Sequence, residues 1–326
     1  MLDSIRDLWL ALPVALFLAL LFLPLNQASA YERKPQKPAI VLAAFGTTDV
    51  EALDAILTVE KKVKAAFPDY DVHLAFTSNI IRDIWHERAG DREFRQANSQ
   101  VPESMYEIKN PLTTLALIQE DGSRNILVQS LHVTNGSEFN DQKNIVTQLA
   151  AIKAHQESKK PFPYIVIGDS AFGAGTPAEL ERAAKALEPL AARAKSEGAT
   201  LVLMGHGNEH LEVKAYRDFG AAMTKMYGQP IQVALVEGEP AFDGVRAELK
   251  KAKVKKVLLA PMMLVAGDHA KNDMAGDEED SWATMLKADG IEVIIHLEGL
   301  GLNSSWADIY VERLKALDAE MKKAAE

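Results

Sequence analysis

Eight short apolar runs constrain the fold of this chain most strongly. Each run ends in glycine or a polar residue and is followed by a stretch with helical periodicity. Runs rich in Val, Ile and Leu that alternate with helices are typical of parallel strands joined by crossover helices, because such strands are buried on both faces. The sequence therefore predicts an α/β fold. We expect the strands at residues 39–44, 72–76, 125–131, 164–167, 200–204, 231–236, 256–260 and 292–295.

The eight runs form two sets of four that match in order. IVLAAFGT at residues 40–47 matches LVLMGHGN at 201–208, an offset of 161, and VHLAFT at 72–77 matches QVALVE at 232–237, an offset of 160. The third and fourth pairs are offset by 131 and 128, because the first half carries extra residues, chiefly the polar stretch 88–110. We therefore predict two similar Rossmann-like domains, each a four-stranded parallel sheet flanked by helices, with a cleft between them.

The boundary between the two domains is expected near Gly198, which divides the chain into residues 31–198 and 199–326. Each half is expected to close with a helix. Residues 178–195 form the first, with Thr176 as its N-cap and Pro177 at its first position, and Ser304 or Ser305 caps the second.

The first thirty residues are a separate segment. Residues 8–25 carry no charge, and Ala28 and Ala30 follow in the pattern of an A-x-A cleavage site. We predict a signal peptide at residues 1–30 and a periplasmic mature chain that begins near Tyr31. The alternative is an uncleaved anchor, because 18 apolar residues approach the length of a bilayer span. Only that alternative brings the protein to a membrane.

Composition narrows the kinds of site. The chain has 46 acidic and 36 basic residues and a net charge of -10, which repels phosphate backbones, so no nucleic-acid partner is expected. It has 0 cysteines, so a metal ion must bind to His, carboxylate or carbonyl groups. The glycine turns at residues 45–48 and 205–208 match neither GxGxxG nor the Walker pattern, and no nucleotide cofactor is expected. A homo-oligomer is compatible with the sequence.

Metal-ligating side chains follow the first three strands of the second half, where the first half carries other residues. They are His206, Glu237 and His269. Because the carboxyl ends of parallel strands meet at one edge of a sheet, these side chains are predicted to form a metal site. Each also has an ordinary alternative: a loop histidine is often structural, and Glu237 is placed to cap the next helix. His132 ends a strand of the first half, and His210 would add a ligand if its segment is helical.

Six stretches of the chain resemble one family. They are VLAAFGTT, AFTSNIIRDIW, VQSLHVTNGSEF, LMGHGNEH, ALVEGEPAF and PMMLVAGDHAKNDMAGDEEDSW. Together they resemble the CbiK family, the anaerobic sirohydrochlorin cobaltochelatases of cobalamin synthesis, from about Pro38 to the C-terminus. The resemblance implies the class II chelatase fold shared with ferrochelatase, in which a tetrapyrrole cleft lies between two similar α/β domains.

The resemblance also implies roles for individual residues. The metal site of the family maps onto His206, Glu237 and His269, and its proton acceptor maps onto His206. The substrates implied are sirohydrochlorin and Co²⁺, with Fe²⁺ as a second candidate, because imidazole and carboxylate ligands do not select between these ions. The residues expected against the macrocycle and its carboxylates are Phe45, Thr47, His132, Met263 and Leu264, of which Met263 and Leu264 are equally expected in the core.

The same ligands would also serve a different class of protein. A periplasmic carrier of metal, haem or another tetrapyrrole needs the fold and the ligands but does not turn over a substrate. An interaction scaffold held at the membrane by an uncleaved anchor needs no tight metal site and no turnover. Only conversion of metal-free tetrapyrrole separates a chelatase from a carrier.

Overall fold

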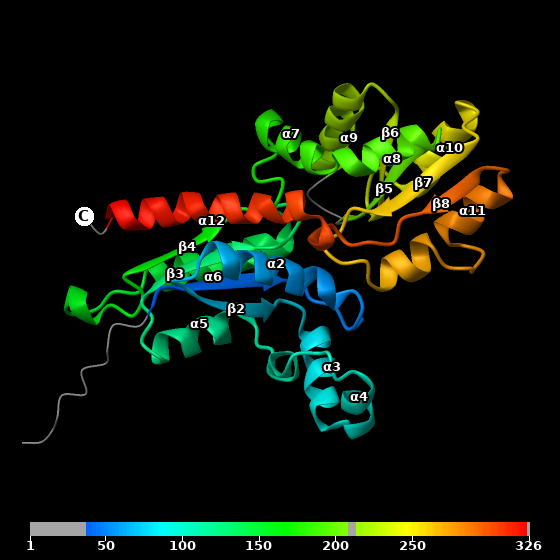
Figure 1. Ribbon diagram of the computed structural model, residues 1–326. Helices are drawn as coiled ribbons and strands as arrows, with labels where there is room; N and C mark the ends of the chain where they lie inside the picture. The colour runs from blue at the N-terminus through cyan, green and yellow to red at the C-terminus, as the bar shows by residue number, and fades with distance from the viewer. Residues whose placement is uncertain (1–36, 208–212, 325–326) are drawn as a thin grey trace, which may run out of the picture. The chain divides into compact units, whose positions relative to one another are not determined.

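Two four-stranded sheets, in which all strands run parallel, form the framework of the chain (Figure 1). The computed structural model describes residues 37–207 and 213–324, so the predicted signal peptide and His210 lie outside the described residues. The first sheet has the order β2-β1-β3-β4 and the second the order β6-β5-β7-β8. This shared order confirms the predicted α/β class and the two matching sets of four strands.

All eight predicted strands are found, with ends that differ by at most a few residues. They are β1 (Ala39–Ala44), β2 (Asp71–Phe76), β3 (Asn125–Ser130), β4 (Tyr164–Gly168), β5 (Thr200–Gly207), β6 (Ile231–Glu237), β7 (Lys256–Pro261) and β8 (Glu292–Ile295).

The largest difference is in β5, which continues three residues beyond its predicted end and therefore contains His206. The extension depends on Gly207, which pairs with Glu237 of β6 and has a φ of 82°. A Cβ atom at this position would lie 1.9 Å from the carbonyl oxygen of Glu237, so only glycine allows the two strands to approach this closely.

Helices cover both faces of each sheet. On the first sheet, α2 (Leu53–Ala66) packs on one face, and α5 (Pro111–Glu120) and α6 (Ser137–Ala150) pack on the other. On the second sheet, α9 (Val213–Tyr227) packs on one face, and α10 (Phe242–Lys251) and α11 (Trp282–Ala288) pack on the other. This two-sided cover explains why all six residues of β1 are buried.

The closing helices are exchanged between the halves. The helices α7 (Pro177–Ala186) and α8 (Glu188–Ser196) end the first half but pack against α9 and β5 of the second. Conversely, α12 (Ser304–Ala324) ends the second half but packs against β3, β4 and α2 of the first (Figure 1). A division of the chain at Gly198 therefore separates the two sheets but not the helices that cover them.

Two hydrogen bonds join the exchanged helices to the elements that they cover. The Tyr310 hydroxyl on α12 donates to the carbonyl oxygen of Leu131 at 3.1 Å, just after β3. In the other direction, the hydroxyl of Tyr227 donates to the carbonyl oxygen of Ala184 on α7 at 2.9 Å. One hydrophobic core consequently joins the two sheets and includes both Ile40 and Leu258.

The polar stretch 88–110 begins in the last turn of α3 (Asn79–Gly90) and contains α4 (Arg92–Ala97) and the short helix η1 (Glu103–Glu107). Trp85 of α3 is fully buried, and its ring meets those of Phe94 and Tyr106 edge to face. Its indole N–H donates to the carbonyl oxygen of Thr47 at 2.8 Å, and Arg88 donates to that of Thr48 at 2.6 Å. These helices therefore hold the loop that follows β1.

Two details of the predicted closing helices are wrong: the first helix is broken in two, and the last one has a different N-cap. The helix expected at residues 178–195 breaks after Ala186, because Pro189 lacks the N–H that a continuous helix needs. At the last helix, the cap is Asn303 rather than Ser304 or Ser305, since the Asn303 side chain accepts from the Trp306 N–H at 3.1 Å. Thr176 does cap α7 as predicted, in a capping box with Glu179.

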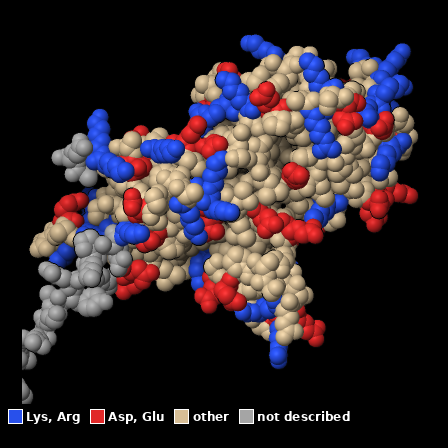
Figure 2. All heavy atoms as spheres, viewed as in Figure 1, with Lys and Arg blue, Asp and Glu red and all other residues tan. Residues whose placement is uncertain are grey.

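Within residues 37–207 and 213–324, no helix combines the length and the apolar character needed to cross a membrane. On the face shown in Figure 2, acidic and basic side chains are interspersed over both halves.

We predict that the contact of α12 with the first sheet contributes strongly to stability. Leu314 is fully buried there, so Leu314→Ala should lower the free energy of unfolding by roughly 2–5 kcal/mol through lost burial and a residual cavity. Lys315 is exposed on the same helix, and Lys315→Ala should change the free energy of unfolding by less than about 0.5 kcal/mol. Urea denaturation of both variants checks this, and equal effects would contradict the packing.

Candidate functional site

Two histidines predicted to bind a metal meet at the edge of the second sheet. His206 is the penultimate residue of β5, and His269 immediately precedes the single π-helical turn η3 (Ala270–Met274). Their ring centroids are 4.9 Å apart and the ring planes make an angle of 82°. Both residues are half-buried. The structure therefore brings together residues that are 63 positions apart in the chain.

Within the described part of the chain, both rings are hydrogen-bonded through the same nitrogen, Nδ1. Nδ1 of His269 lies 2.6 Å from a carboxylate oxygen of Asp273, and Nδ1 of His206 lies 3.2 Å from the carbonyl oxygen of Gly207. Both partners accept hydrogen bonds, so each Nδ1 must carry the proton. In the neutral form of each ring, Nε2 then has the lone pair that binds a metal ion or accepts a proton.

Glu237, the third predicted ligand, is in register with the residue that follows His206. It ends β6 opposite Gly207, and in paired parallel strands the residues in register point to the same face. His206 is one position earlier, so its side chain leaves the sheet on the other face. Among the described residues, no group of three His, Asp or Glu side chains is placed to hold a metal. Glu237 as a ligand stays a prediction.

The ordinary alternative for Glu237 also receives no support. The side chain that bonds to the start of α10 is that of Glu239, which accepts from the Ala241 N–H at 3.0 Å. Glu237 is exposed, and no hydrogen bond from a described residue reaches its carboxylate.

The loop that carries His269 contacts the loop after β1 in the other half. A Cβ atom at Gly267 would lie 3.4 Å from the hydroxyl of Thr47, which is in van der Waals range. The ammonium of Lys271 lies 2.5 Å from a carboxylate oxygen of Asp49 and 2.8 Å from one of Glu51. Burial alone would raise the pKa of Asp49, but the hydrogen bond from Lys271 holds it below its usual value. These contacts set the position of His269 relative to the first half.

The backbone N–H groups that follow Thr47 are already occupied. Asp49 Oδ1 accepts from the N–H groups of Glu51 at 2.9 Å and Ala52 at 3.0 Å. The N–H of Asp49 itself donates to the Thr47 hydroxyl at 3.1 Å. Two of these N–H groups therefore bond to the Asp49 carboxylate and the third bonds to Thr47, and a contact between them and substrate carboxylates stays a prediction. A direct substrate contact by Thr47 stays a prediction.

The apolar residues expected against a macrocycle are in different environments. Phe45 is 46% exposed at the end of β1. Met263 and Leu264 are half-buried, and each packs against a different core cluster. Their carbonyl oxygens accept from Leu300 and Gly301 at 2.9 Å in both cases, which ties this loop to the short helix η4 (Leu300–Leu302). Phe45 is thus the most available of the three.

His132 lies just beyond β3 in a buried polar cluster. Its Nδ1 is 3.0 Å from the Ser130 hydroxyl and 3.3 Å from the amide nitrogen of Gln142. Its Nε2 is inaccessible to solvent and has no hydrogen-bond partner among the described residues. Burial lowers the pKa of His132 to about 4, so the ring is neutral near pH 7.

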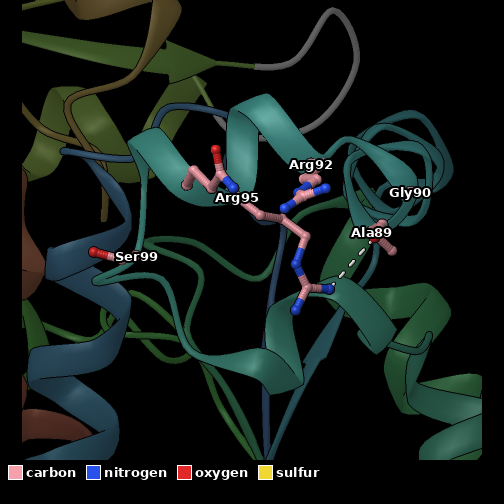
Figure 3. A pocket seen from close by; sticks show the side chains of 6 residues that line it. Ala89, Gly90, Arg92, Arg95 and Ser99 are labelled. Carbon is pink, nitrogen blue, oxygen red and sulfur yellow. Dashed lines mark hydrogen bonds between the residues drawn. The ribbon is translucent and has the colours of Figure 1, made fainter.

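A hollow of about 550 Å³ lies away from these residues, along α3 and α4 (Figure 3). It is lined by Ala89, Gly90, Arg92, Arg95, Gln96 and Ser99. Arg95 donates to the carbonyl oxygen of Ala89 at 3.3 Å and forms two hydrogen bonds to Glu103. None of the predicted site residues lines this hollow, and the guanidinium of Arg95, the less exposed of its two arginines, is already paired with Glu103.

Sequence reasoning missed the residues that support the two histidines. Asp273 follows His269 by four positions, a spacing that places two side chains on one side of a helical turn, so this signal was present in the sequence. Lys271 and Asp49 come from different halves, and no local pattern indicates that they pair.

Comparison with known proteins identifies similar chains. The model of one protein family, described as cobalt chelatase (CbiK), matches residues 38–318. The sirohydrochlorin cobaltochelatase of Salmonella typhimurium is 30% identical over 292 residues, which cover 89% of this chain and 100% of that protein. The sirohydrochlorin cobaltochelatase CbiKC of Nitratidesulfovibrio vulgaris is 28% identical over 281 residues, or 86% and 90% of the two chains.

Solved structures share the fold at low sequence identity. The sirohydrochlorin chelatase SirB from Bacillus subtilis subspecies spizizenii, solved in complex with cobalt, has a TM-score of 0.53 at 15% identity and covers 86% of this chain and 95% of its own. DR2241 from Deinococcus radiodurans, a multi-domain protein with structural similarity to chelatases, has a TM-score of 0.51 at 11% identity, covering 85% and 55%. At these identities the likeness concerns the fold alone.

We predict that Lys271 stabilises the contact between the loops through charge. Lys271→Gln should lower the free energy of unfolding by up to about 1 kcal/mol at low salt, because its ion pairs are partly exposed. The loss should shrink at about 1 M NaCl, where charges are screened within about 3 Å. Lys287→Gln, an exposed lysine with no ion pair among the described residues, is the control. A loss that is independent of salt would contradict an ionic contact.

We also predict that His132 makes the protein sensitive to acid. Its pKa is about 4 in the folded state and about 6.5 when unfolded, so the unfolded state binds more protons between these values. The contribution of neutral His132 to the free energy of unfolding is therefore fully present above pH 6.5 and is lost as the pH falls towards 4. At pH 5 this loss is about 2 kcal/mol.

His132→Asn, which keeps an acceptor near the position of Nδ1, should remove this part of the pH dependence. Urea denaturation of both proteins at about pH 7.5 and pH 5 measures it. His155→Asn, in an exposed loop, should follow the wild-type profile. The same pH dependence in His132→Asn and wild type would show that His132 is not the group responsible.

Proposed function

Because this chain belongs to the cobalt chelatase (CbiK) family, and is therefore a metal chelatase, we propose that it inserts Co²⁺ into sirohydrochlorin with release of two protons. The observation that carries the proposal is the pair of neighbouring imidazoles, His206 and His269, each bonded through Nδ1 to an acceptor, so that Nε2 is the ligand nitrogen of the neutral ring. Fe²⁺ is the second metal to be tested, since ligands of this type do not exclude it.

Metal insertion requires ligands that hold an ion and then release it. The ion must lose water, contact the protein and pass to four ring nitrogens, while two pyrrole N–H protons leave the macrocycle. Two imidazoles supply fewer bonds than a closed structural site and leave coordination positions open for water and for substrate. The pair of histidines in this chain fits such an exchange better than permanent metal storage.

The removal of protons is assigned to residues at the same edge of the sheet. With Nδ1 of His206 bonded to the carbonyl of Gly207, its Nε2 is the atom available to accept a pyrrole proton. Glu237 is exposed at the end of β6, and we assign its carboxylate to offset metal charge and take the second proton. Phe45, exposed at the end of β1, is the apolar side chain that we assign to contact with the macrocycle.

The proposal is tested by turnover. Purified protein from Tyr31 onward is mixed anaerobically with sirohydrochlorin and Co²⁺, with Fe²⁺ in a parallel series, and the absorbance change is followed beside a reaction without protein. We expect several turnovers for each protein molecule. Binding that saturates at one equivalent without metallation would identify a carrier on the chelatase fold and would contradict the proposal.

The two histidines should be required for that turnover. We expect His206→Ala and His269→Ala to lower the rate of insertion at least about 100-fold, because each removes an open imidazole ligand. Their circular dichroism spectra should match that of wild type, since both rings are half-buried at the end of the sheet. His155→Ala, in an exposed loop, is the control and should retain full activity. Near-normal turnover in either site variant would contradict the assignment.

We further propose that the mature protein acts in the periplasm. The uncharged segment at residues 8–25 and the small residues Ala28 and Ala30 support export and cleavage. The mass of the protein recovered from the periplasmic fraction tests this, because cleavage predicts a chain that begins near Tyr31. Full-length protein found in the membrane fraction would instead support the anchor.

A further inference from the structure

The turn that follows His269 is anchored at both ends. Ala270 and Met274, the first and last residues of η3, are fully buried in the second core cluster. The turn ends with a hydrogen bond from the N–H of Gly276 to the carbonyl oxygen of Asn272 at 3.0 Å. A Cβ atom at Gly276 would lie 2.5 Å from that same oxygen, so glycine is needed for this closure. The side chains between the two anchors are therefore presented from a well-defined backbone.

Two carboxylates of this segment have different partners. Asp268 Oδ1 accepts from the side-chain amide of Asn272 at 2.7 Å. Asp273 Oδ2 lies 2.6 Å from Nδ1 of His269. The pairing of Asp268 with Asn272 leaves Asp273 as the carboxylate that bonds to the imidazole. π-Helical turns in proteins frequently occur at functional sites, and here the turn places this carboxylate against a predicted metal ligand.

The two histidines are held by bonds of unequal strength. His269 donates to a carboxylate at 2.6 Å, whereas His206 donates to the carbonyl of the next residue in the chain at 3.2 Å. Hydrogen bonds to ionised acceptors are shorter and about twice as strong as those between neutral groups. A carboxylate on the far nitrogen of an imidazole also fixes its tautomer and makes the other nitrogen a better metal ligand. The two rings are thus chemically different although both expose Nε2.

We infer that Asp273 is a positioning residue that fixes His269 in the tautomer with the proton on Nδ1. His269 is thereby the imidazole that first binds and retains the incoming divalent ion, and the less firmly bonded His206 is the one that exchanges the metal for a proton. This inference rests on the proposed function, because it divides the roles of the same two histidines in metal insertion.

The tautomer is tested directly by long-range ¹H–¹⁵N correlation spectra of metal-free protein at about pH 8, with His269 assigned by comparison with His269→Ala. We expect wild-type His269 to carry its proton on Nδ1. In Asp273→Asn, the amide can donate as well as accept, so we expect the proton to move to Nε2 or to be shared between both nitrogens. A wild-type ring protonated on Nε2 would overturn the inference.

The consequence for metal binding is tested by calorimetric titration with Co²⁺ alone. Asp273→Asn should weaken Co²⁺ binding about 10- to 100-fold, the usual effect of losing a carboxylate behind a metal-bound histidine. Asp268→Asn is the matched control, because it removes an equal charge from the same segment without touching the imidazole, and its affinity should remain within about twofold of wild type. Equal losses in both variants, or no loss in Asp273→Asn, would overturn the inference.

Neither measurement depends on turnover of sirohydrochlorin, so the two proposals can fail separately. The expected tautomer and Co²⁺ affinities without turnover would retain the role of Asp273 and reject the chelatase function. Turnover by the wild-type protein, together with a His269 tautomer and a Co²⁺ affinity that do not change in Asp273→Asn, would retain the chelatase function and reject the role of Asp273. Circular dichroism of both asparagine variants should match that of wild type, because Asp and Asn have nearly the same shape.

Discussion

The exchange of closing helices is the constraint on which the rest of the structure depends. Because α12 covers the first sheet and α7 and α8 cover elements of the second, neither sheet can complete its core without the other half of the chain. The largest core cluster accordingly runs from Ile40 in the first sheet to Leu258 in the second. The loops at the strand ends of both halves are therefore carried by parts that share one hydrophobic core.

Those loops meet where the candidate chemistry lies. Thr47 is adjacent to Gly267, and Lys271 bonds to Asp49, so the segment that carries His269 is braced from the opposite half. The brace does not contribute a ligand itself. It positions a π-helical turn whose carboxylate orients His269, while β5 presents His206 4.9 Å away. Tertiary contacts on one side and a local turn on the other thus converge on two imidazoles.

Much of this arrangement could be predicted from the sequence, and the exceptions have identifiable causes. The strands were found because short continuous apolar runs that end in glycine or polar residues leave a local pattern. The break before Pro189 was missed although proline reports it directly. The pairing of Glu237 with Gly207 rather than with His206 could not be read from the sequence, because it depends on the register between two strands, where a shift of one residue reverses the face of every side chain.

The sequence by itself determined the α/β class, the duplication of the four-stranded unit, and the place of His206 at the end of one strand and of His269 in the segment after another, because each of these leaves a periodic or local signal in the chain. Only the tertiary structure decided which helix covers which sheet, that Asp49 occupies the N–H groups after Thr47, and that Lys271 joins the two halves. Those outcomes depend on packing between segments far apart in sequence, where the energy of a contact is set by distance and burial rather than by neighbouring residues.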